Sequence, residues 1–208
     1  MAQTVAPGTI QAVGSATINF TPNQAQFTVG VVTQGTTAQD AAQQNATLST
    51  TVQNALKSAL GTNGTIQTIG YSVGPRYSNA TPPAIAGYTA SNTVLVTTYN
   101  LTNIGSLIDT ATQAGGNNIG GVSFGLQNPD SFIQQALSAA GKQALAYAGA
   151  IAAGLGGTTG KVVSAVQGSS YTPVIVNGPA AGAPTTTPIQ TGSVSVSANV
   201  TVVVLLVQ

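Results

Sequence analysis

The segment SFIQQALSAAGKQALAYAGAIAAGLG, residues 131–156, places apolar side chains at helical spacing, and its only charged residue is Lys142. Apolar residues that recur every three or four positions predict one buried helical face. Asn128 followed by Pro129 predicts where this helix begins, because proline is favoured at the first helical position and the preceding asparagine can cap. We therefore expect a long helix over residues 129–153.

The outer face of this helix is expected to be free of charge. From Ala146 onward its outward positions are alanine and glycine. Small side chains let another backbone approach closely, which favours a protein neighbour, although alanine is also simply a good helix former on a surface. The expected buried stripe consists of Ile133, Ala136, Leu137, Ala140, Ala144, Ala148, Ile151 and Leu155. The candidate contacts with a neighbour are Ala146, Gly149, Ala150 and Ala153.

The rest of the chain shares this lack of charge. Only 3% of its 208 residues are charged, four of them Lys or Arg and three Asp, whereas a typical globular domain is about 25% charged. A near-neutral surface promotes association. A hydrophobic content of 42% is enough for the core of one domain or two small lobes. These features favour a folded protein that either assembles with other protein molecules or is coated, for example with glycans.

Towards the N-terminus, the pattern predicts two hairpins and a second long helix. Residues 9–20 and 26–34 alternate apolar and polar positions, which predicts a first hairpin. Thr37 stands three residues before Asp40, as in a capping box, and opens a helix over residues 37–60. Residues 64–75 and 84–100 are rich in β-branched and aromatic residues, which predicts a second, longer hairpin.

The remaining elements are shorter. A short helix is expected from Thr102 to the glycines at 115 and 116, followed by a strand over 119–126 and another over 161–167. Residues 171–190 are rich in Pro, Gly and Thr and predict a long loop. The chain closes with a strand whose last run, Val202 to Val207, is expected to be buried on both faces.

The composition excludes most catalytic chemistry. His, Cys and Glu are absent, so Ser-His-Asp and Cys-His sites cannot form. A Ser-Lys pair would have to use Lys57, Lys142 or Lys161, which read more naturally as solvated lysines. Three dispersed Asp residues predict no metal site, and four dispersed cations predict no nucleic-acid surface. We therefore expect no enzyme activity, no cofactor and no nucleic-acid partner.

Two further groups of residues are candidates for modification or binding. A loop around residues 71–88 could present aromatic side chains and one guanidinium to a glycan or peptide, although tyrosine also commonly fills strand positions. Its residues are Tyr71, Arg76, Tyr77 and Tyr88. Glycans could replace charge as a source of solubility. The candidate glycosylation sequons begin at Asn19, Asn45, Asn63, Asn79, Asn100 and Asn199.

Several segments, in order along the chain, resemble the SIMPL-domain family, which includes the periplasmic immunogenic proteins. The resemblance implies an α+β fold with antiparallel strands packed against two long helices and one short helix. It also implies export, ring-like assembly in one branch, and weakly defined roles in oxidative-stress tolerance or as a surface antigen. The segments that carry it are TIQAVGSATINFTPNQAQFTVGV, TTAQDAAQQNA, IQTIGYSVGPRY, IAGYTASNTVLVT, IGSLIDTATQAGGNNIGGVSF, ALSAAGKQALAYAGAIAAGLGGTTGKVVS and TPIQTGSVSVSANVTVVV.

The predicted organisation has four parts: an N-terminal segment over 1–8, a SIMPL-like domain over 9–170, the loop over 171–190, and a strand over 191–208 that completes the domain. The N-terminal segment, with Thr4 and Val5, is expected to dock on a neighbour. No signal-peptide pattern and no transmembrane segment are expected.

We expect an exported structural protein that forms a fibre or ring, at the cell surface or in the periplasm, through strand pairing and small-residue helix packing. Both terminal strands are candidates for this pairing. The alternative is a soluble envelope binding module or oxidative-stress factor without catalysis.

Overall fold

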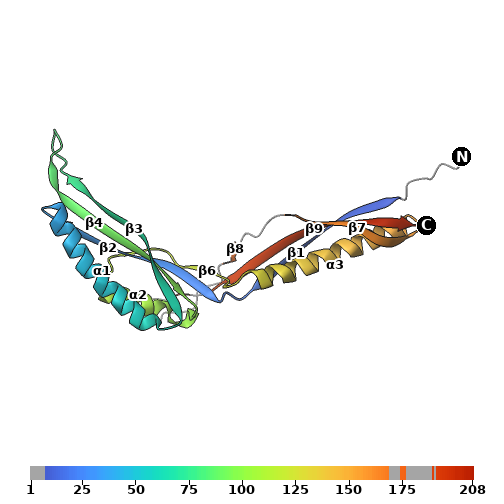
Figure 1. The fold of residues 1–208 in the computed structure, drawn as a ribbon, viewed down its shortest axis with the longest axis horizontal. Coiled ribbons are helices and arrows are strands. Elements are labelled where there is room, and N and C mark those ends of the chain that lie inside the picture. The colour runs from blue at the N-terminus through green and yellow to red at the C-terminus, as the bar shows by residue number, and fades with distance from the viewer. Residues whose placement is uncertain (1–7, 169–173, 177–188, 190) are drawn as a thin grey trace. The chain divides into compact units, whose positions relative to one another are not determined.

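The computed structural model describes residues 8–168, 174–176, 189 and 191–208, and divides into two units (Figure 1). The α3 unit comprises Met1–Thr21, Asn128–Val176 and Ser193–Gln208, and the α1 unit comprises Pro22–Gln127 and Asn177–Gly192. Each unit has its own antiparallel sheet with helices packed on one face. This arrangement confirms the predicted α+β class.

The α1 unit contains a sheet in the order β3-β4-β2-β5, with β6 also paired to β2. Helices α1 and α2 pack on one face of this sheet, over a core that includes Phe27, Leu56 and Ile104. Its elements are β2 (Gln24–Gly35), α1 (Ala38–Leu60), β3 (Gly64–Tyr77), β4 (Ile85–Thr98), η1 (Leu101–Asn103), α2 (Ile104–Gln113), β5 (Asn118–Ile119) and β6 (Ser123–Gly125).

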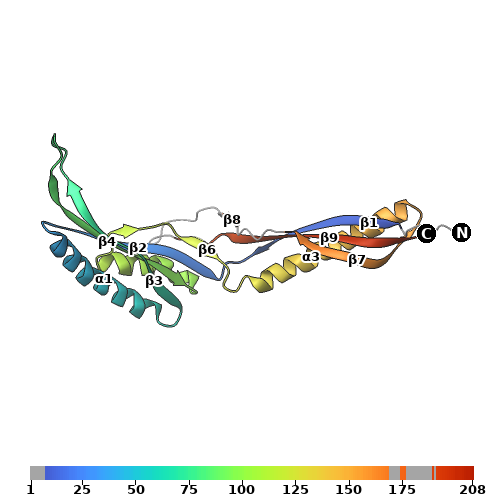
Figure 2. The same cartoon turned by 45° about the horizontal axis from the view of Figure 1, so that its top comes forward.

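The α3 unit contains a sheet in the order β1-β9-β7, with β8 also paired to β9. In both views helix α3 runs along the strands of this sheet (Figures 1 and 2), and it contacts β1, β9 and β7. Its elements are β1 (Thr9–Phe20), α3 (Asp130–Gly154), β7 (Thr158–Gly168), β8 (Val174–Val176) and β9 (Ser193–Val207).

Most predicted elements form, but the first predicted hairpin is wrong. β1 pairs with β9, from Thr9 opposite Leu205 to Phe20 opposite Val194, while β2 pairs with β4, β5 and β6. The alternating pattern correctly indicates two strands, but the period of two carries no information about which strand each one joins. The second predicted hairpin is confirmed, since β3 pairs with β4 along its length.

Two further predictions about strands need correction. The strand expected over 119–126 is divided into β5 and β6, which both pair with β2. β9 is not buried on both faces: Val202 and Val204 are buried beneath α3, whereas Val203 and Leu205 on the other face are half-buried. Helix α3 covers only one side of this three-stranded region, so the apolar run at the C-terminus keeps one accessible face.

The starts of the two long helices differ. The Thr37 hydroxyl oxygen accepts a hydrogen bond from the Asp40 amide at 3.1 Å, which confirms the predicted cap of α1. Helix α3 begins at Asp130 after Pro129 with no side-chain cap. The predicted cap by Asn128 is wrong, because this residue has a φ of 55° and makes a left-handed turn before the helix.

The structure describes only some parts of the predicted organisation, which stays a prediction. Most of the loop expected over 171–190 lies outside the described residues, although Val174–Val176 form strand β8. Of the expected docking segment, only Gly8 is described, so Thr4 and Val5 lie outside the described residues. Gly8 continues the pairing of β1, since its carbonyl accepts a hydrogen bond from the Leu206 amide at 2.8 Å.

Candidate functional site

Helix α3 turns its smallest side chains towards its own sheet. Its fully buried residues recur every four positions, and a β-carbon on Gly14 of β1 would collide with the backbone of Ala140 and Ala144. The helix therefore lies very close to the sheet, with methyl groups filling the narrow space between them. The buried residues are Ala136, Ala140, Ala144, Ala148 and Ala152.

Large apolar side chains in the second half of α3 and just after its end are consequently displaced from the core. Ile151 and Leu155, which the sequence places in the buried stripe, are 44% and 59% exposed, so that part of the prediction is wrong. Leu145 and Tyr147 are exposed to a similar degree. The alanines at every fourth position allow the closest approach to the sheet, and this approach fixes which face of the helix points inward. A soluble monomer rarely gathers so many large apolar groups on one helix surface.

The outer face of α3 also carries the predicted contact residues. Ala146, Ala150 and Ala153 are exposed and Gly149 is half-buried. A β-carbon on Gly149 would meet no neighbouring atom. All four positions are thus accessible to another molecule, and their role as contacts stays a prediction.

Strand β1 has a free outer edge within the described residues. The carbonyl of Gly8 points towards β9, whereas the Ser15 amide points the other way and donates to the side-chain oxygen of Gln143 at 2.7 Å. Because backbone groups alternate along an antiparallel strand, the amides and carbonyls of Thr9, Gln11 and Val13 also point outward. The strand has no charged residue, no proline and no register shift, so it lacks the usual protections of an edge.

A row of α3 residues borders this edge. The contact between Gln143 and Ser15 places one side of the helix beside β1. Residues four positions apart lie on one side of a helix, so Tyr147, Ile151 and Leu155 continue that side. We name Gln143, Tyr147, Ile151 and Leu155 the α3 flank.

The opposite edge of the same sheet is protected. Strand β7 carries Lys161 and has two register shifts against β9, between Thr159 and Val162 and between Val162 and Ser164. Charges and bulges on an edge strand disfavour pairing with another chain. The C-terminal strand β9 is paired on both sides, by β1 and β7. The prediction that both terminal strands are available to a neighbour is therefore wrong for the C-terminal one.

In the predicted aromatic site, Arg76 points to the sheet face opposite that of Tyr88. Tyr88 lies opposite Pro75, while Arg76 lies opposite Gly87 on the next rung of the ladder. Consecutive residues of a strand point to opposite faces, so the Arg76 and Tyr88 side chains diverge. Tyr71 and Tyr77 are each more than half exposed. These residues form a tyrosine-bearing surface without a shared pocket for the guanidinium.

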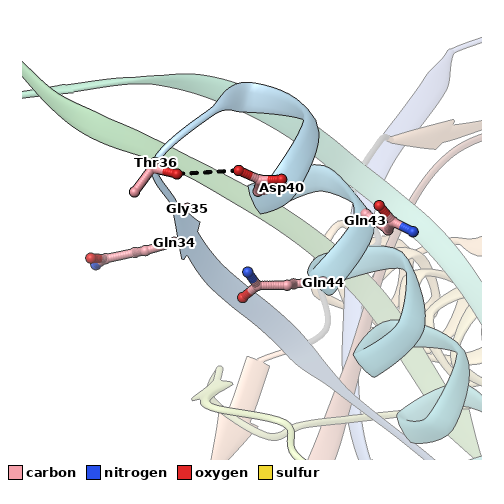
Figure 3. Close-up of a pocket in the computed structure, with 6 residues that line it drawn as sticks. All are labelled: Gln34, Gly35, Thr36, Asp40, Gln43 and Gln44. Atoms are coloured by element: carbon pink, nitrogen blue, oxygen red, sulfur yellow. Dashed lines mark hydrogen bonds between the residues drawn. The ribbon is translucent and has the colours of Figure 1, made fainter.

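An open polar concavity lies where β2 meets α1 (Figure 3). Its volume is about 410 Å³, and the Thr36 hydroxyl donates to the Asp40 carboxylate at 3.2 Å on its rim. This concavity was not predicted from the sequence. The glutamines at positions 34, 43 and 44 were the signal that could have indicated it. It could accept a neutral polar ligand but carries one charge and no nucleophile–base pair. The lining residues are Gln34, Gly35, Thr36, Asp40, Gln43 and Gln44.

No catalytic or metal-binding cluster is found in the part of the chain that the structure describes. Within it, no three residues with His, Cys, Asp or Glu side chains come together as metal ligands. Lys57, Lys142 and Lys161 all have exposed side chains. The absence of enzyme activity stays a prediction.

The sequons fall into different environments. Asn45 is fully buried, and its amide nitrogen donates to the carbonyls of Val31 at 2.7 Å and Ala90 at 3.1 Å. The structure therefore removes Asn45 from the candidate glycosylation sites. Asn100 is half-buried and accepts hydrogen bonds from Thr102. The exposed candidates are Asn19, Asn63, Asn79 and Asn199.

Among the described residues, none of the helices combines the length and the apolar character needed to cross a membrane.

Comparisons with known proteins agree on one family. A family model described as "SIMPL: Protein of unknown function (DUF541)" matches residues 10–204. Two similar proteins, from Brucella melitensis biotype 1 and Brucella abortus strain S19, are both called 26 kDa periplasmic immunogenic protein. Each is 30% identical to this chain over 166 residues. The match covers 77% of this chain but only 66% of each relative, so the chain spans about two thirds of their length.

Proposed function

The chain belongs to the SIMPL (DUF541) family, and from this premise we propose that it is an exported structural protein that assembles with copies of itself into a ring or fibre. The relatives' name, periplasmic immunogenic protein, supports a location in the periplasm. A position at the cell surface would satisfy the same features. The assembly serves as an envelope structure without catalysis.

One observation carries the proposal: the α3 unit exposes large apolar side chains around an unprotected strand edge. Tyr147, Ile151 and Leu155 are each 44–59% exposed beside β1. Val13 and Val166 are also more than half exposed on the sheet face away from α3, where both align with Thr201 of β9. With only 3% charged residues, the chain has little surface charge to keep such areas apart. Covering them with further copies removes apolar surface from water.

Electron microscopy of native protein, purified without denaturant, tests the proposal. We expect closed rings or fibres. Dispersed particles of monomer size at high protein concentration would overturn it. Intact mass on the same native material tests the coating alternative, because covalent glycans would raise the mass above that of the polypeptide.

The N-terminal segment is expected to take part in this assembly through Thr4 and Val5. Deleting residues 1–8 and measuring particle size by light scattering tests this role. Smaller particles are expected, and particles of unchanged size would show that the segment is an ordinary tail.

The concavity at α1 and the exposed tyrosines favour a second candidate, a soluble envelope binding module. A neutral glycan suits the amide-rich lining of the concavity, since amides both donate and accept hydrogen bonds. Titration with neutral oligosaccharides would support this candidate if binding were lost in Gln44→Ala. Unchanged binding in that variant would exclude this site.

A further inference from the structure

We infer that two copies of the chain pair antiparallel through the outer edges of their β1 strands, about a twofold axis at Gln11, so that their sheets join and their α3 flanks cover each other. This inference rests on the proposed self-assembly and names one of its contacts. The occupant of the β1 edge is thus a second copy of this chain.

The free backbone groups fix the register of this pairing. Thr9, Gln11 and Val13 present outward amides and carbonyls, and the next outward amide, Ser15, is already bonded to Gln143. The available stretch is therefore centred on Gln11. In the paired state Gln11 lies opposite its counterpart, and Thr9 of each copy lies opposite Val13 of the other. Such a pairing forms about six backbone hydrogen bonds.

The spacing of the helices supports a second copy in particular. Helix α3 contacts β1 and β9 most extensively, so its axis lies over the space between them, about half a strand spacing inside β1. Adjacent strands are about 4.8 Å apart, so the two helices would lie roughly 10 Å apart across the seam. This separation is at the upper end of the 8–10 Å range in which helices pack against each other. A bare strand from another protein would supply no such helix.

The α3 flank lies level with the free edge. Gly14 lies against Ala140 and Ala144, and Ile10 and Ala12 pack in one cluster with Ala148 and Ala152. Ile151 is therefore level with the middle of the free edge. Across the axis it faces its counterpart, while Tyr147 of each copy faces Leu155 of the other. Side chains that are half exposed in one copy become buried between two.

The absence of charge on β1 and on the α3 flank also suits pairing of two identical surfaces. A twofold axis places identical residues near one another, so any charge at the seam would be repelled by its counterpart. Neither β1 nor the α3 flank contains a charged residue. The protected strand β7, which carries Lys161, forms the opposite edge of the sheet.

Cysteine cross-linking of the full chain tests the contact, because the natural sequence has no cysteine. In the paired state of Gln11→Cys, the Cα atoms of the two introduced cysteines are about 5.5 Å apart. This distance is within the Cα–Cα range of a disulfide. The matched control is Thr17→Cys, an exposed position in the same strand. The two Thr17 positions would be about 40 Å apart in the pair. We expect Gln11→Cys to form a covalent dimer at least tenfold faster than Thr17→Cys under a mild oxidant.

A second pair of variants measures the dimer without a covalent bond. Ile151→Lys places two like charges at the axis and should raise the dimer dissociation constant at least a hundredfold in sedimentation equilibrium. Ser138→Lys adds the same charge at an exposed position of α3 away from β1 and should change it less than threefold. Ile151 is exposed in the single copy, so both variants should keep the far-ultraviolet circular dichroism of the parent chain.

The outcomes separate this contact from assembly in general. Rings or fibres that persist while Gln11→Cys cross-links no faster than Thr17→Cys would overturn the β1 contact and leave the proposed function standing. A chain that is monomeric at every concentration would overturn both. A fast covalent dimer with no larger species would support the contact and contradict the ring or fibre.

Discussion

Helices α1 and α3 have similar lengths, 23 and 25 residues, yet they bury opposite kinds of side chain. Helix α1 inserts Val52, Leu56 and Leu60 into a core with Phe27. All fully buried residues of helix α3 are alanines, while Leu145, Tyr147 and Ile151 are accessible. The α1 unit therefore completes the core beneath its helix within one chain, although its β3–β4 hairpin also exposes Ile69, Tyr71 and Ile85. In the α3 unit it is the helix itself that keeps apolar surface, beside a free strand edge that another copy can cover.

The edge of β2 in the α1 unit and the edge of β1 in the α3 unit also differ in whether their backbone groups are occupied. In the α1 unit, the Asn117 side chain donates to the Val32 carbonyl and accepts from the Val32 amide, both at 2.8 Å, which occupies the edge of β2 beyond β5. In the α3 unit, the Ser15 amide is the one outward amide of β1 that bonds to a side chain, counting only pairs of described residues. At these two edges, the α1 unit blocks β2 and the α3 unit leaves β1 ready to pair. The other edge strand of the α1 unit, β3, contains Pro75 and Arg76.

The largest expected effect comes from truncating one leucine in α1 and, for comparison, the leucine that follows the last residue of α3. Leu56→Ala should lower the free energy of unfolding by about 4 kcal/mol, because Leu56 is fully buried and its removal leaves a cavity. The matched variant Leu155→Ala should cost less than about 0.5 kcal/mol in the unassembled chain, since Leu155 is on the surface. Urea denaturation at low protein concentration measures both. Equal losses would contradict the contrast between the helices.

The close approach of α3 to its sheet is tested at Gly14. Gly14→Ala should destabilise the α3 unit by about 2–3 kcal/mol, because the added methyl group meets the backbone of Ala140 and Ala144, which cannot move aside separately. The control is Gly70→Ala, where an added β-carbon meets no neighbouring atom. It should be neutral or slightly stabilising. Tolerance of both substitutions would show that α3 lies farther from β1 than described.

The polar contact of α1 with its sheet should contribute less. Asn45→Ala removes the donor for the Val31 and Ala90 carbonyls and should cost about 2 kcal/mol. The neighbouring exposed residue offers the control, and Gln44→Ala should change stability by less than about 0.5 kcal/mol. Thermal unfolding followed by circular dichroism compares them, and an Asn45→Ala variant as stable as Gln44→Ala would remove this contact from the account.

The smallest effect is expected at the helix starts. Thr37→Ala removes the side-chain acceptor of the Asp40 amide and should cost about 1 kcal/mol. Helix α3 has no side-chain cap, so Ser131→Ala in its first turn should be nearly neutral. A comparable loss in both variants, measured by urea denaturation, would mean that the start of α3 depends on a hydroxyl group as well.

The sequence predicted the elements better than their partners. Apolar periodicity located both long helices, the Thr37 cap and the β3–β4 hairpin, because these depend on neighbouring residues. It joined β1 to the wrong strand, since every residue of β1 lies more than 170 residues from its partner in β9 and alternation is the same in any pairing.

The candidate surface was predicted only in outline. The lack of charge and the small residues at Ala146 and Ala150 pointed to a protein neighbour on α3. Hydrophobicity alone placed Ile151 and Leu155 inside, whereas close packing of alanines against Gly14 turned them outward. The free edge of β1 could not be recognised until its pairing with β9 was known.

Sedimentation velocity of the full chain, over roughly 1 to 100 μM and at low and high salt, shows whether the apolar surface of the α3 unit binds further copies. We expect species larger than the monomer whose fraction rises with protein concentration. Added salt should not reduce that fraction, because so few charges are present to be screened. A single monomeric species under all these conditions would show that this apolar surface is not an interface between copies.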